Sequence, residues 1–295
     1  MTRYEPAIDV DAIKAIDFHV HIEVDGAGHG SLPDDLAAAA SRYFSTDGPR
    51  PDIDSVADYY RERHMAAVVF TVDAETRLGH PPLSSEEIAQ AAARHNDVLI
   101  PFGSVDPRQG ANAVDRVRRL VGDFGVRGFK FHPTVQGFDP SDERHYPLYA
   151  TLEEEGVVAL FHTGQTGIGA GLPGGRGLRL GLSNPMLLDA VAADFPALQI
   201  VMAHPAVPWQ DEALAIATHK PNTWIDLSGW SPRYFPHELV RYAGTILKDR
   251  VLFGTDFPLL TPDRWLRDIA ETTLKPEALP GILKDNAVRL LHLAH

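Results

Sequence analysis

The sequence predicts an α/β fold, a (β/α)₈ barrel, and three observations support it. Apolar runs of strand length alternate with amphipathic segments of helix length along nearly all of the 295 residues. The runs are continuously apolar, which is typical of parallel strands covered on both faces. Eight strand–helix units follow one another, which favours a barrel over a doubly wound sheet, the alternative fold.

The elements are expected in strict alternation. The eight strands are expected at residues 15–20, 66–72, 98–104, 126–131, 157–161, 198–203, 223–227 and 250–254. The helices are expected near 54–64, 85–95, 110–122, 145–155, 184–194, 209–219, 236–247 and 262–272, with a last one near 276–292. Asp54 and Ser85 are candidate N-terminal caps, and Pro185 suits a first helical turn.

Two insertions interrupt the alternation, after strands 1 and 5. Residues 23–53 contain an Ala-rich helix candidate at 32–44, and residues 164–183 contain eight glycines together with Arg176 and Arg179. Both are expected at the C-terminal face of the barrel, where such folds build their active sites. We therefore expect one domain over residues 1–295, with both insertions lining the site.

The composition restricts the classes of function. A net charge of −13 argues against nucleic acid and anionic membranes as partners, although a local basic loop can still bind an anionic small molecule. The absence of cysteine excludes disulfides, thiolate catalysis and Cys-based metal sites. No apolar run reaches membrane-spanning length and the first twenty residues are polar, so a cytoplasmic location is expected.

Histidines and an aspartate follow several of these strands. His19 and His21 end the first strand, and side chains at i and i+2 of a strand point to the same side. His162, His204 and Asp256 end strands 5, 6 and 8, so a closed barrel brings all five to one mouth. Imidazoles and a carboxylate suit one divalent cation, with Zn²⁺ expected and Mn²⁺ or Fe²⁺ left open. A free coordination position would hold a water of lowered pKa, and a nearby His or Asp could take its proton.

Other residues near the strand ends are candidate substrate contacts. Lys130 and His132 end strand 4 and share a face, and for both a purely structural role remains the alternative. Arg176, Arg179 and Trp230 could meet an aromatic or anionic substrate, although arginines in a loop are often only solvated.

Four motifs in order resemble the amidohydrolase superfamily, within it the branch that includes aminocarboxymuconate-semialdehyde decarboxylase. They are Asp17-Phe18-His19-Val20-His21, Phe161-His162-Thr163-Gly164, Ala203-His204-Pro205 and Phe253-Gly254-Thr255-Asp256-Phe257-Pro258. The resemblance implies that His19, His21, His162 and Asp256 bind one divalent metal, while His204 contacts the water or substrate. Decarboxylases of the branch often carry Glu-x-His at the first motif, whereas this chain has His-x-His.

The second half is also similar to a smaller set, the aryl β-ketoacyl-CoA hydrolases. The segments that carry this similarity are 182–185, 219–222 and 226–230. It implies hydrolytic cleavage of a C–C bond. We expect a metal-dependent hydrolase that uses a metal-activated water on a carbonyl substrate, with Asp256 as proton acceptor and His204 as base or carbonyl polariser. The first alternative is a metal-dependent non-oxidative decarboxylase of an aromatic or unsaturated acid, and the second is a metal-independent lactonase or ligand-binding barrel. The expected partner is a small molecule, an acyl-CoA or an aromatic acid, and analogy with similar barrels leaves a homo-oligomer open.

Overall fold

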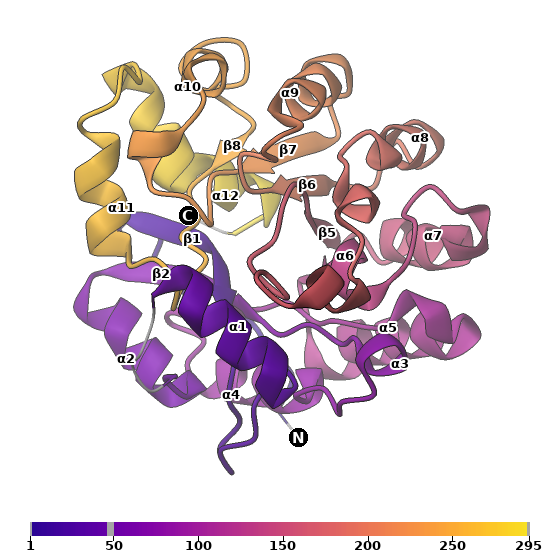
Figure 1. Ribbon diagram of the computed structural model, residues 1–295. Helices are drawn as coiled ribbons and strands as arrows, with labels where there is room; N and C mark the ends of the chain where they lie inside the picture. The colour runs from indigo at the N-terminus through magenta and orange to yellow at the C-terminus, as the bar shows by residue number, and fades with distance from the viewer. Residues whose placement is uncertain (1, 46–49, 294–295) are drawn as a thin grey trace.

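The structure is a computed structural model that describes residues 2–45 and 50–293. The strands run in chain order around the centre of the molecule and the helices form an outer ring (Figure 1). The strands are β1 Ala15–His21, β2 Met65–Phe70, β3 Leu99–Pro101, β4 Gly128–Phe131, β5 Val158–His162, β6 Ile200–Ala203, β7 Thr223–Asp226 and β8 Val251–Leu252. The main helices are α1 Asp34–Phe44, α2 Ile53–Glu62, α4 Ser85–Arg94, α5 Ala111–Phe124, α7 Tyr146–Glu154, α8 Leu187–Asp194, α9 Gln210–His219, α10 His237–Ala243, α11 Pro262–Ile269 and α12 Asn286–Leu290.

All strand pairs are parallel and the sheet closes on itself. Strands β1 to β3 pair in order, as do β4 to β8. Parallel bridges between Gly103 and Phe129 and between Val20 and Phe257 join these two sets at both seams. The predicted (β/α)₈ barrel is therefore confirmed.

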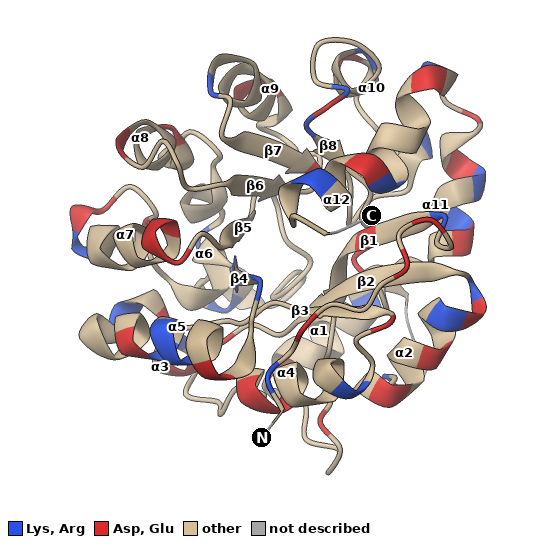
Figure 2. Ribbon diagram, turned by 180° about the vertical axis from the view of Figure 1, so that it is seen from behind, with Lys and Arg blue, Asp and Glu red and all other residues tan. Residues whose placement is uncertain are grey.

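The apolar residues of each strand divide between two cores, as expected for strands buried on both faces. Ala67 and Val69 of β2 pack with the helices in the outer core, whereas Ala66 and Val68 belong to a core inside the barrel. Residues of α12 join the inner core and close the barrel at the end opposite the strand carboxyl ends. Charged residues lie mostly on the outer helices and loops, while most of the strands carry none (Figure 2).

Helix ends differ from the expected ones because other side chains make the capping hydrogen bonds. Asp52 and Ser84 accept from backbone N–H groups and cap α2 and α4, so the caps predicted at Asp54 and Ser85 were wrong. Helix α8 begins only at Leu187, because Asn184 Oδ1 accepts from the N–H of Met186 and forms a turn around Pro185.

The end of the chain departs most from the prediction. In place of one helix over 276–292, the structure has a 3₁₀ turn at Pro276–Ala278, a π-helical turn at Gly281–Asp285 and then α12. Phe253 N donates to Ile282 O at 2.8 Å, which ties the π-helical turn to the residue that follows β8.

Both insertions lie over the C-terminal face of the barrel. Helix α1 crosses in front of the strands, beside the loop that follows β5 (Figure 1). That loop contains two 3₁₀ turns, η3 Pro173–Gly177 and η4 Leu180–Ser183, and short helices α3 Glu75–Leu78 and α6 Pro133–Gln136 also follow strand ends. Residues 46–49 of the first insertion lie outside the described residues. No helix in the described ranges is long and apolar enough to cross a membrane.

Candidate metal centre and cavity

Three predicted ligands meet at the C-terminal mouth of the barrel. His21 Nε2 lies 3.1 Å and His19 Nε2 lies 3.4 Å from Asp256 Oδ1. One potential ligand atom from each of the three side chains lies within 4.8 Å of the others. Two imidazoles and a carboxylate in this arrangement form a candidate site for a divalent metal.

Asp17 fixes the backbone on which this group depends. Its carboxylate accepts hydrogen bonds from the N–H of His19 at 3.1 Å and from the Thr255 N–H and Oγ1 at 2.9 and 2.6 Å. Tyr60 Oη donates to it at 2.6 Å. The N–H of Asp256 in turn donates to His19 O at 2.9 Å, so strand β1 and the segment after β8 are held in register at the site.

A buried carboxylate orients the first imidazole. Asp226, at the end of β7, accepts from His19 Nδ1 at 2.5 Å, and both side chains are fully buried. This contact places the proton of neutral His19 on Nδ1 and leaves the electron pair of Nε2 available to the Lys130 ammonium or to a cation. Burial raises the pKa of Asp226 to about 6, and nearby His204 opposes that rise.

His162 and His204 form a chain on the opposite wall. His204 Nε2 lies 2.9 Å from His162 Nδ1, and His204 Nδ1 lies 2.9 Å from Ser228 Oγ. His162 Nε2 is buried and has no hydrogen-bond partner among the described residues. An unpaired buried nitrogen at this place is consistent with a missing ligand, so the donor set fits a cation, although His162 lies outside the tight group of three.

Lys130 is a buried cation within the same cluster. Its Nζ lies 2.9 Å from His19 Nε2 and 5.0 Å from the ring centroid of Phe70. Burial lowers the pKa of Lys130 to about 8, while Asp256 and Asp226 oppose that change. The same Phe70 ring lies under both imidazoles of β1, with centroid distances of 5.0 and 4.9 Å.

The protonation states suit cation binding. Burial lowers the pKa values of His19, His162 and His204, so these imidazoles are neutral at pH 7 and can donate electron pairs. Burial alone would raise the pKa of Asp256, but the hydrogen bond from His21 and the charges of the neighbouring histidines lower it well below its usual range. Asp256 is therefore ionised.

The backbone is strained where two of these side chains are presented. His204 and Asp256 have positive φ values of 71° and 68°, which are uncommon outside glycine. Gly229 also has a positive φ, of 76°, and a Cβ there would lie 2.7 Å from His204 Nδ1. The turn after β7 can therefore approach His204 only because residue 229 has no side chain.

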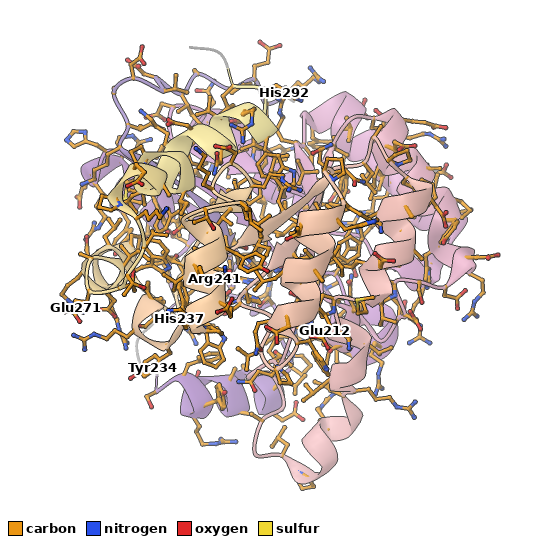
Figure 3. All side chains as sticks on the ribbon, turned by 90° about the horizontal axis from the view of Figure 1, so that it is seen from above. Glu212, Tyr234, His237, Arg241, Glu271 and His292 are labelled. Atoms are coloured by element: carbon orange, nitrogen blue, oxygen red, sulfur yellow. The ribbon has the colours of Figure 1, made fainter. Side chains whose placement is uncertain are left out.

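A cavity of about 310 Å³ opens above the cluster. His21, Lys130, His132, His162, His204 and Asp256 form its polar floor. Its apolar walls come from the first insertion, the loop after β5 and the loops after β7 and β8; they include Leu32, Tyr43, Phe44, Ile168, Trp230, Tyr234, Leu259 and Leu260. Tyr234 points toward the end of the molecule that carries α1, and His292 lies at the opposite end (Figure 3).

Three of the five predicted substrate contacts line the cavity and two do not. Lys130, His132 and Trp230 line the cavity, and the His132 ring stacks on that of His162 at a centroid distance of 3.8 Å. Arg176 and Arg179 are both exposed and are absent from the cavity lining. Arg176 instead pairs with Asp35 of α1 at 2.6 Å, which ties the two insertions together.

Sequence reasoning assigned no role to three residues that position the site. Asp17 holds the backbone of His19 and of Thr255 next to Asp256, Asp226 orients the His19 ring, and Ser228 contacts His204. An acidic residue within or at the end of an apolar strand was the available signal for the two aspartates, because a buried carboxylate needs partners. Nothing in the sequence distinguishes Ser228 from an ordinary turn residue.

Comparisons with known proteins agree with this geometry. The family model described as amidohydrolase matches residues 16–293. A search of curated proteins finds no match.

Solved structures share the fold over almost the whole chain. An uncharacterised TIM-barrel protein, Bb4693 from Bordetella bronchiseptica, is 23% identical with a TM-score of 0.75, covering 95% of this chain and 99% of that one. 2,6-Dihydroxybenzoate decarboxylase from Rhizobium is 16% identical with a TM-score of 0.70, covering 95% and 99%. A dihydroxybenzoic acid decarboxylase from Polaromonas sp. JS666, solved with bound manganese and the inhibitor 2-nitroresorcinol, is 16% identical with a TM-score of 0.65, covering 95% and 97%. Because the family model matches residues 16–293, nearly the whole chain, this chain belongs to the amidohydrolase family.

Proposed function

We propose that this protein is a metal-dependent, non-oxidative decarboxylase of a small aromatic acid. The observation that carries the proposal is the cavity itself: a His19–His21–Asp256 group and the Lys130 ammonium lie at the floor of a cavity with largely aromatic and aliphatic walls. Such a cavity suits a flat apolar body with an anionic end directed toward the floor. The aromatic-acid decarboxylases of the same fold support this choice by analogy.

We propose His19, His21, His162 and Asp256 as the metal ligands. When bound, the cation would supply positive charge for the substrate carboxylate and a neighbouring oxygen. Zn²⁺ suits the nitrogen-rich donor set, and the manganese in the Polaromonas enzyme makes Mn²⁺ the first alternative.

Decarboxylation breaks the bond between the ring carbon and the carboxylate and returns one proton to that carbon. Asp256 suits the transfer, because its side chain is 11% exposed to the cavity and its ionised carboxylate can accept a proton from a phenolic hydroxyl and return it to the ring. His204 would hold the oxygen of the substrate, while Lys130 stabilises the negative charge that develops on the ring oxygen. His132 and Trp230 would contact the ring.

The test is a panel of hydroxybenzoates, β-ketoacyl-CoA thioesters and lactones, assayed in D₂O with CO₂ measured. We expect CO₂ from at least one hydroxybenzoate, one deuteron at the vacated ring carbon, and a loss of at least about 100-fold in kcat/KM for Asp256→Asn. Release of an acid that carries oxygen from heavy-oxygen water, without CO₂, would contradict decarboxylation.

Hydrolysis is the second candidate because the first motif is His19-Val20-His21, where decarboxylases of the resembled branch often carry Glu-x-His. In that case Asp256 and His204 would take the proton of the attacking water, and the substrate would carry a carbonyl, as an aryl β-ketoacyl-CoA does. The same panel separates the two reactions.

A further inference from the structure

The lining of the cavity contains a second cationic side chain, which the proposed reaction does not use. Arg264, in the first turn of α11, is the one arginine among the described residues that line the cavity. Its side chain is 52% exposed, and its guanidinium donates no hydrogen bond to another described residue. Its nearest carboxylate is Asp268 Oδ2, at 3.6 Å from Nε.

Arg264 belongs to a group of arginines around one buried carboxylate. The Asp268 side chain is 2% exposed, and Arg233, Arg264 and Arg267 lie 3.8, 3.6 and 3.3 Å from it. Arg233 also pairs with Glu271 at 2.6 Å, so three guanidinium groups face two carboxylates. A local excess of positive charge therefore lies beside the cavity of a chain whose net charge is −13.

The two cations of the cavity lining come from different elements. Lys130 and the three ligands lie at the floor, on the strand ends, whereas Arg264 lies on the helix after β8. Trp230, Leu259 and Leu260 belong to the loops that lead to these outer elements and line the same cavity. A ligand that fills this cavity contacts the Lys130 ammonium, apolar side chains and the Arg264 guanidinium.

We propose that Arg264 determines specificity by binding a second anionic group of the substrate, remote from the reacting carboxylate. The assignment rests on the proposed function for the reacting end. The substrate is then an aromatic acid with an anion at each end. The second anion could be another carboxylate on the aromatic body or the phosphate of a coenzyme A thioester, since a guanidinium that donates no hydrogen bond to a described residue can bind either group.

Binding of paired probes tests this. The pairs are benzoate with terephthalate and cinnamate with para-carboxycinnamate, titrated calorimetrically into the metal-loaded protein, with coenzyme A as a separate probe. Arg264→Gln removes the guanidinium, and Arg267→Gln is the matched control because Arg267 is on the same helix, contacts the same Asp268 and does not line the cavity.

We expect wild type to bind the dicarboxylate of each pair about tenfold more tightly than the monocarboxylate. This difference corresponds to the free energy of about one charge-assisted hydrogen bond. Arg264→Gln abolishes this preference and Arg267→Gln keeps it. A dicarboxylate preference identifies a second carboxylate as the source, while coenzyme A binding that Arg264→Gln abolishes identifies a phosphate. The proposal is overturned if wild type shows no preference for either kind of probe, or if Arg264→Gln retains it. Because no turnover is read, an Arg264-dependent preference stands even where the panel of acids releases no CO₂, which would reject only the proposed reaction.

Discussion

Single buried side chains decide whether the strand-end histidines can act as ligands. His19 is fully buried, and its orientation depends on the 2.5 Å contact with Asp226 and on the hydrogen bond from its own N–H to Asp17. A metal ligand held by a carboxylate in this way has both its tautomer and its ring plane fixed. The site therefore depends on residues that do not line the cavity.

Asp226→Asn should weaken the metal centre without unfolding the protein. The amide can present its NH₂ group to His19 Nδ1, which favours the other tautomer and removes the electron pair from Nε2. We expect Zn²⁺ affinity to fall roughly 10- to 100-fold, measured by competition with a chelator. An unchanged affinity in a folded variant would show that Asp226 does not orient His19, and circular dichroism checks the fold.

The sequence predicts the candidate ligands better than it predicts the residues that position them. His19, His21 and Asp256 could be grouped because strand alternation and barrel closure alone bring them together. The position of His204 relative to His162 depends on a positive φ and on Ser228, which no periodic pattern encodes. Arg176 lies in the same loop as several residues that line the cavity, but it pairs with Asp35 in the acidic first turn of α1 instead.

At the scale of elements, the two insertions form one wall over the barrel mouth. A Cβ at Gly167, in the loop after β5, would lie 2.5 Å from the Phe44 ring and 2.6 Å from the Tyr43 ring of α1. The absence of a side chain there allows the loop and the helix to pack closely, and Phe44, Tyr43 and Gly167 all line the cavity.

Gly167→Ala should loosen this wall and act mainly on substrate binding. The added methyl must displace α1 or the loop, because its nearest atoms belong to aromatic rings. We expect KM to rise about three- to tenfold with kcat nearly unchanged, since the floor is not touched. Gly181→Ala is the matched control, because a Cβ there has nothing within 4 Å. Equal kinetics for both variants would refute the role of the α1–loop contact.

The sequence predicts where a helix begins and ends only when its own apolar and polar residues determine these ends. Helix α5 buries Ala113, Val117, Leu120 and Phe124 along one face and was expected within two residues of its observed bounds. The broken segment after Pro276 was not, because the hydrogen bond from Phe253 N to Ile282 O joins residues that only the closed barrel brings together. Local propensity cannot anticipate such a contact.

At the scale of the whole molecule, buried titratable groups act in opposite directions on stability. Burial raises the pKa of Asp17 to about 7 and of Asp226 to about 6, which favours folding at acid pH. Burial lowers the pKa values of His19, His162 and His204 and also that of His145, whose ring packs edge-on against Phe138 at 5.2 Å. The pH dependence of the free energy of unfolding of wild type therefore contains contributions of both signs. The difference in this free energy between wild type and a single variant isolates one group.

His145→Gln isolates one of these groups at a distance from the metal centre. The folded pKa of His145 lies below the unfolded value, so the unfolded chain binds more protons and wild type loses stability as pH falls through about 6.5. We expect the variant to lose less, so that the free energy of unfolding of wild type minus that of the variant decreases from pH 8 to pH 5 in urea titrations. A difference that is constant with pH would contradict the effect of burial on His145.

The most direct test of the proposed metal centre is elemental analysis of the purified wild-type protein. The His19→Ala and Asp256→Ala variants are analysed in the same way. We expect about one equivalent of Zn²⁺ or Mn²⁺ per wild-type chain, and a large loss of that metal in both variants, which remain folded. A fully active wild-type protein without stoichiometric metal, or variants that retain it, would contradict the assignment of these strand ends as a metal centre.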